Sequence, residues 1–93
     1  MIIPEQFQLA GITWTVREQD DAINLGQTFR DKALIILQSE QLQQSKEATF
    51  CHELIHAIKY MLGHPEPHNE EEVEQWSYYL HQYLQGIQID RPD

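Results

Sequence analysis

The chain has little of what would tie it to an oxidising compartment, to nucleic acid or to a membrane. It has 93 residues, one cysteine, and six Lys and Arg against fifteen Asp and Glu, for a formal net charge of −9. One cysteine excludes an internal disulfide and fits a reducing compartment. The excess of carboxylates repels phosphate backbones, and no apolar run reaches the roughly 18 residues of a membrane span. No signal peptide is recognisable either. We therefore expect a cytoplasmic protein that binds neither nucleic acid nor membrane.

Glycine and proline are also scarce, with four of each. Hydrophobic residues make up 41% and aromatic residues 10% of the chain, which excludes wholesale disorder. A chain of this length supports one modest core. We expect residues 1–93 to form a single domain.

The first forty residues have the pattern of short β-strands. Residues 12–16 alternate apolar side chains with threonine, which predicts a strand with one buried face and Trp14 as a core anchor. Ala10 and Gly11 predict a hairpin turn before it. The four candidate strands are residues 7–9, 12–16, 23–29 and 33–37. We expect a small antiparallel sheet of three to four strands.

A helix is expected next, because residues 47–62 contain neither Gly nor Pro and their apolar residues recur at helical spacing. Ser39 or Ser45 could cap its start, and Gly63 is suited to end it. Within this helix, Cys51 is expected to be a small buried hydrophobic residue rather than a ligand or nucleophile.

A second helix is expected from Glu70 to about Gln85, with Asn69 as its cap and Gly86 as its end. Its inward stripe consists of Val73, Ser77, Leu80 and Leu84, and Trp76 is expected to be a core anchor like Trp14. Four strands followed by two helices predict an α+β domain, with two antiparallel helices packed on one face of the sheet.

The string His52-Glu53-Leu54-Ile55-His56 carries the chemistry. Positions i and i+4 of a helix lie on one face, where two imidazoles can bind one Zn²⁺. Glu53 need not bind the metal and can instead take a proton from water and pass it to a leaving amine. A lone helical histidine is usually an ordinary core or surface residue, but a pair that encloses a glutamate predicts a zinc site.

A third protein ligand would leave one zinc position open for water. The candidate third ligands downstream in the sequence are His64, His68, Glu70, Glu71, Glu72 and Glu74. Glu70 lies on the inward face of the second helix and is our choice, with Glu71, Glu74 and His68 as the alternatives. The tyrosines 60, 78, 79 and 83 are expected mainly in packing, although a hydroxyl near the metal would stabilise an oxyanion.

The stretch from Thr49 to Ile58, followed by Glu70-x-x-Val73-Glu74, resembles the short phage and bacterial zincin-like proteins related to the ImmA/IrrE-type metallopeptidases. The resemblance covers roughly residues 33–85. It implies a minimal zincin-like fold of gluzincin type. It also implies His52, His56 and Glu70 as zinc ligands and Glu53 as the catalytic base.

Two functions of different classes follow. The first is a zinc metallopeptidase that hydrolyses a peptide or protein substrate, paired in extended form along an exposed edge strand at residues 34–37. The alternative is a zinc-stabilised protein-interaction module without turnover, whose acidic surface would serve a basic partner. Glu53 distinguishes them, because a purely structural site has no use for a carboxylate there.

Overall fold

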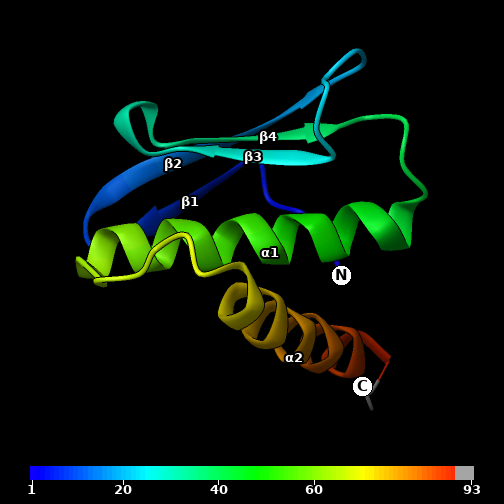
Figure 1. Ribbon diagram of the computed structural model, residues 1–93. Helices are drawn as coiled ribbons and strands as arrows, with labels where there is room; N and C mark the ends of the chain where they lie inside the picture. Colours follow the sequence, from blue (N-terminus) through cyan, green and yellow to red (C-terminus); the bar gives the residue numbers. More distant parts are fainter. Residues whose placement is uncertain (90–93) are drawn as a thin grey trace.

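Among residues 1–89, four strands form one mixed sheet in the order β1-β2-β4-β3, and two helices follow it (Figure 1). The computed structural model describes residues 1–89. The strands are β1 (Gln6–Leu9), β2 (Ile12–Gln19), β3 (Gly26–Phe29) and β4 (Leu34–Gln38), with a short 3₁₀ turn, Arg30–Lys32, before β4. The predicted α+β class is confirmed.

The expected all-antiparallel sheet is wrong in one pairing. β1 and β2 form the predicted hairpin through Ala10 and Gly11, both with positive φ, and β3 is antiparallel to β4. β2 and β4, however, run parallel, with Val16 opposite Ile35. The reason is that β4 is the most apolar strand and gains most from neighbours on both sides, so it lies between β2 and β3.

This order also corrects the expected edge strand. Residues 34–37 belong to β4 in the interior of the sheet, whereas β3 lies at the edge. β3 is also shorter than the predicted strand at 23–29, because it begins only at Gly26. Its outer backbone groups have no neighbouring strand in the sheet.

The first helix, α1 (Gln43–Leu62), is longer than predicted. It begins at Gln43, after Leu42, which makes no side-chain capping bond, so neither Ser39 nor Ser45 is its cap. Its end is as predicted: Gly63 has a φ of 68°, and its amide donates to the Tyr60 carbonyl.

The second helix, α2 (Glu70–Ile89), starts as predicted, since the amide of Glu72 donates to the Asn69 side chain at 3.1 Å. Gly86 does not end it. The helix continues through Gly86 to Ile89, because glycine lowers helix propensity without preventing helical geometry.

The two helices form two layers rather than one. α1 packs against β3 and β4, and α2 packs against the opposite side of α1 while running back in the reverse direction (Figure 1). The expectation that both helices cover the sheet is therefore wrong. This stacking sets the start of α2 over the middle of α1, where the histidines lie.

The core lies between the sheet and α1. Its buried cluster consists of Trp14, Ile35, Leu37, Phe50, Cys51 and Ala57. Trp14 is a core anchor as predicted, but Trp76 is 43% exposed and is not one. Cys51 is fully buried, and burial raises the pKa of its thiol to about 11, in keeping with a packing role. Among residues 1–89, no helix is long and apolar enough to cross a membrane.

Candidate metal centre

His52, His56 and Glu70 come together at the crossing of α1 and α2. One ligand atom from each lies within 4.8 Å of the others, so these three residues could hold a metal ion. We call them the metal group. The two imidazole rings are one helical turn apart, with centroids 5.2 Å from each other. Glu70, the first residue of α2, reaches both: its Oε1 is 2.9 Å from His56 Nε2 and its Oε2 is 3.1 Å from His52 Nε2.

A backbone carbonyl orients His56. The imidazole is buried, and its Nδ1–H donates to the carbonyl oxygen of Pro67 at 2.8 Å. In the neutral ring Nε2 then carries no proton, and its lone pair points towards Glu70. Metal-binding histidines typically donate their second nitrogen in this way. Sequence reasoning missed Pro67, because a main-chain acceptor carries no signal in residue type.

The chemistry and spacing of the donor atoms suit a metal ion. A nitrogen lone pair that faces a carboxylate oxygen at 2.9 Å requires a proton or a cation between them. Ligand atoms at about 2.0–2.1 Å from a tetrahedral centre are roughly 3.4 Å apart, so a small outward shift of Glu70 suffices. Two imidazoles and one carboxylate suit zinc, although imidazole nitrogen also suits copper, iron and nickel.

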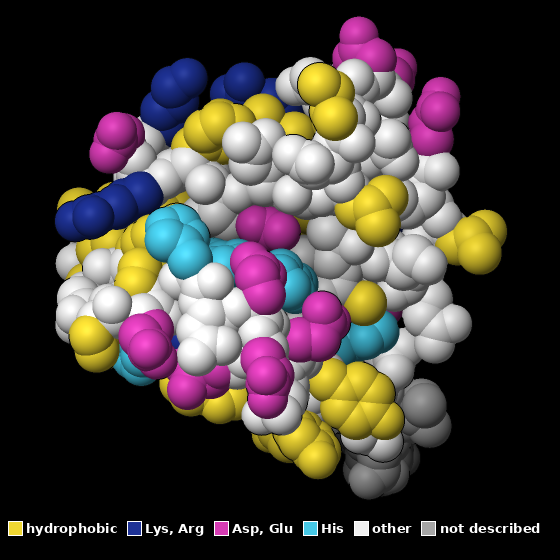
Figure 2. Space-filling view, viewed as in Figure 1, with side chains coloured by type: hydrophobic (Ala, Val, Ile, Leu, Met, Phe, Trp, Pro, Cys, Tyr) yellow, Lys and Arg dark blue, Asp and Glu magenta, His cyan; other side chains and the backbone are white. Residues whose placement is uncertain are grey.

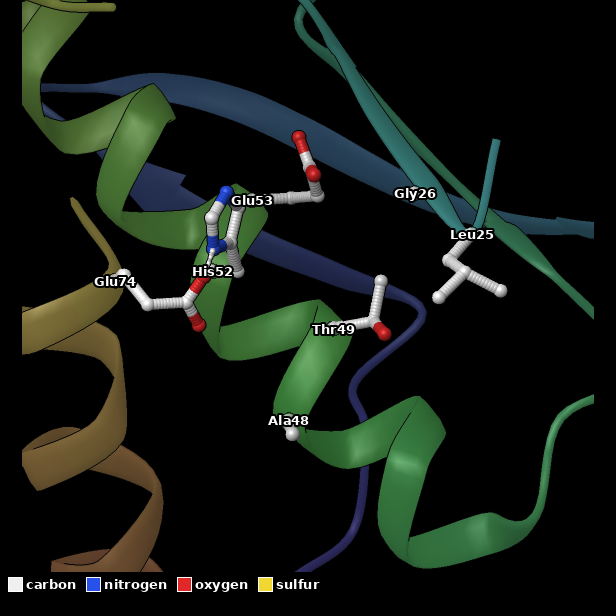
Figure 3. Close-up of a pocket in the computed structure, with 7 residues that line it drawn as sticks. All are labelled: Leu25, Gly26, Ala48, Thr49, His52, Glu53 and Glu74. Atoms are coloured by element: carbon white, nitrogen blue, oxygen red, sulfur yellow. Dashed lines mark ion pairs between the residues drawn. The ribbon is translucent and has the colours of Figure 1, made fainter. Parts of the chain in front are cut away.

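Glu74 lies on the far side of His52. Its Oε2 is 3.8 Å from His52 Nδ1 (Figure 3), whereas Glu70 contacts the other ring nitrogen, Nε2. The carboxylate therefore approaches the ring that it could help to orient, and it is not part of the three-residue group. Glu71 is exposed and also stands outside that group.

The remaining downstream candidates have other contacts. Glu72 accepts a hydrogen bond from the buried Lys59 and lies 3.7 Å from His64 Nε2. His68 contacts the Tyr60 hydroxyl at 3.2 Å, and its ring lies 6.1 Å from that of His56. His68 is thus beside the metal group without belonging to it.

Glu53 is buried beside the metal group and outside it. The Thr28 hydroxyl lies 2.6 Å from its Oε1 and 3.1 Å from its backbone carbonyl, and the single proton best fits the shorter contact. This hydrogen bond links the Glu53 carboxylate on α1 to the edge strand β3. The other carboxylate oxygen, Oε2, takes no part in it. Nothing in the sequence marked Thr28, because threonine is ordinary in a strand.

Gly26 leaves room for that carboxylate. A Cβ at this position would lie 2.5 Å from Thr49 Cγ2, 3.0 Å from Glu53 Cγ and 3.2 Å from Glu53 Oε2. Any side chain on Gly26 would thus crowd the oxygen that Thr28 leaves free. The sequence suggested only a weakened strand at this glycine, and the close approach of α1 to β3 is the actual reason for it.

An open cavity surrounds the pair formed by His52 and Glu53. In the space-filling view, histidine and acidic side chains gather in a hollow between the sheet and α2 (Figure 2). One part of the cavity, drawn in Figure 3, is lined by Leu25, Gly26, Ala48, Thr49, His52, Glu53 and Glu74. The other part extends past Thr28 to Tyr60 and His68. A ligand in this cavity would lie along β3.

Tyr60 supplies a hydroxyl at one end of this cavity. Burial raises the pKa of Tyr60, the nearby carboxylates of Glu53 and Glu70 raise it further, and the guanidinium of Arg30 opposes them. The hydroxyl is therefore protonated at neutral pH and can donate a hydrogen bond. Of the four tyrosines, this is the one that borders the metal group.

Comparison of the chain with family models, with curated proteins and with solved structures found no significant match.

Proposed function

We propose that this protein is a zinc-dependent metallopeptidase. One observation carries the proposal: a buried carboxylate, Glu53, lies beside the three-residue metal group without joining it. A structural metal site gains nothing from such a group, whereas hydrolysis needs a proton acceptor next to the metal. The open cavity at the same point supports the proposal, since a substrate could reach the pair.

His52, His56 and Glu70 would hold the ion. A zinc ion held there supplies Lewis-acid chemistry, since it polarises a carbonyl and makes water more acidic. Glu53 Oε2 would take the proton from the attacking water and then give it to the leaving amine. Thr28 keeps the carboxylate in position through Oε1, and Tyr60 lines the cavity as a hydrogen-bond donor to the substrate.

An extended peptide is the substrate that the site suits best. β3 is an edge strand of the sheet among residues 1–89, and it borders the cavity that His52 and Glu53 line. Main-chain pairing along β3 would hold a peptide in register and bring one of its carbonyl groups to the metal group. This assigns to β3 the role that the sequence suggested for residues 34–37.

The alternative is a zinc-stabilised interaction module without turnover. The arrangement of α2 favours this candidate, because the metal group joins the start of α2 to the middle of α1. An ion there would fasten the outer helix to the rest of a small chain, and its binding energy would become folding energy.

Cleavage by the zinc-loaded wild-type protein tests the proposal. We expect about one zinc ion per chain by elemental mass spectrometry. We also expect new termini in a mixed peptide library by liquid chromatography and mass spectrometry. A chelator should abolish cleavage and added zinc should restore it. Stoichiometric zinc without any cleavage would reject the peptidase and favour the interaction module.

Thr28→Val should lower kcat by about 10- to 100-fold, because the variant loses a hydrogen bond to a charged group without a change in shape. Zinc stoichiometry should not change, since Thr28 does not touch the metal group. Thr28→Ser retains the hydroxyl and should restore most of the rate. Equal rates for the Val and Ser variants would show that the hydroxyl does not position Glu53.

A further inference from the structure

One side of α2 exposes a row of large side chains. The aromatic stripe, as we name it, consists of Trp76, Tyr79, Tyr83 and Ile87, which are 43%, 69%, 65% and 41% exposed. Their spacing of three and four residues aligns them along one line of the helix. The line lies beside the face that carries the buried Val73 and Ser77. Patches of this kind are typical of interaction surfaces.

The part of α2 that carries the stripe contains no Asp, Glu, Lys or Arg. In a chain of net charge −9, there is no Asp, Glu, Lys or Arg from Gln75 to Ile89. His81, the one histidine in that stretch, turns towards Glu47 on α1, with its Nε2 3.5 Å from that carboxylate. Most surfaces of so acidic a protein would bring carboxylates of two copies into direct contact, whereas this stretch of α2 contributes none. A cationic partner, in contrast, would need carboxylates along the stripe.

Gly86 adds a second, independent observation. It lies inside α2, where glycine costs about 1 kcal/mol relative to alanine. Among the residues that the structure describes, a Cβ at Gly86 would meet nothing within 4 Å, so packing within residues 1–89 gives no reason for a residue without a side chain. The glycine directly precedes Ile87 of the stripe, and its missing side chain lets another helix approach there closely.

We propose that the aromatic stripe is the interface of a homodimer, in which α2 helices from two copies pack antiparallel about a two-fold axis. In the register that places Tyr79 of one protomer opposite Tyr83 of its partner, the two-fold axis passes beside position 81 of both helices. Trp76 then falls opposite Gly86, so that the large indole fits the gap left by the missing side chain. A two-fold interface needs such a self-complementary surface. The proposal is independent of the metal group, whose residues all lie outside the stripe.

Analytical ultracentrifugation of the protein, with and without added zinc, tests this dimer. Wild-type protein should pass from monomer to dimer between low micromolar and several hundred micromolar concentration. Tyr79→Glu should weaken the dimer at least about tenfold, because it buries a charge in the interface. The control is Gln82→Glu, which adds the same charge at an exposed residue of α2 outside the stripe and should leave the dimer unchanged.

Two further measurements sharpen the result. Gly86→Gln should raise the helix content and thermal stability of the monomer, yet weaken the dimer, because the new side chain fills the gap. Added salt should tighten the dimer by screening the repulsion between two acidic chains. A wild-type protein that stays monomeric at every concentration and salt would overturn the proposal. So would equal effects of Tyr79→Glu and Gln82→Glu.

Discussion

Glu53→Gln should slow peptide cleavage by about 10²- to 10⁴-fold while zinc still binds at the same stoichiometry. Glutamine has nearly the shape of glutamate, and its amide oxygen can still accept the Thr28 hydroxyl. The variant therefore loses little except the capacity to take up a proton. Since Glu53 is outside the metal group, the ligands of the ion are unchanged.

The measurement compares kcat/KM and zinc content on the same preparations. Glu71→Gln is the matched control, because it makes the same chemical change at an exposed glutamate outside the metal group and should leave both quantities at wild-type values. A Glu53→Gln variant that cleaves peptides nearly as fast as the wild type would remove Glu53 from the reaction. Loss of zinc in that variant would instead make Glu53 part of the metal site.

Glu70→Ala should weaken zinc binding by more than about 100-fold. Outer partners of a metal site are already worth about 10- to 100-fold in affinity, and Glu70 supplies one of three ligand atoms. The substitution leaves His52 and His56 on α1, and two imidazoles alone make a much poorer site. The outer helix should also be held less firmly, because Glu70 contacts both histidines.

Competition with a chromophoric chelator measures this affinity, and thermal unfolding with and without zinc measures its effect on stability. Glu71→Ala changes the adjacent exposed residue and should bind zinc like the wild type. Glu74→Ala should lose no more than about tenfold, since Glu74 approaches only the far nitrogen of His52. Should Glu74→Ala prove the more damaging variant, the third ligand is Glu74 and not Glu70.

Local periodicity made part of the candidate site predictable. His52 and His56 are one turn apart on any helix that includes them, and Glu70 falls on the face of the second helix that must turn inward. Both inferences need only the geometry of a helix and the way in which two helices pack. The turn at Ala10 and Gly11 and the caps at Gly63 and Asn69 are equally local.

The other part of the site depends on contacts between distant segments. Thr28 and Gly26 matter because β3 lies at the edge of the sheet beside α1, and strand order is a property of the whole sheet. A meander would have left β4 at the edge, whereas the observed order places β4 in the interior of the sheet, where Leu34, Ile35 and Leu37 are buried. The prediction that Trp76 is a core anchor was wrong for a related reason. Its size suggests a core residue, whereas its position on α2 exposes it.

The layered arrangement of α1 and α2 separates the parts of the site by how firmly they are held. Glu53 is hydrogen-bonded to the sheet through Thr28. Glu70, in contrast, belongs to α2, whose main packing contacts are with α1 only. Brief detachment of α2 would carry away one metal ligand and leave the two histidines and Glu53 in place. The residence time of an ion held there would then be governed by the opening rate of α2, so that exchange of the ion and docking of α2 would be one kinetic event.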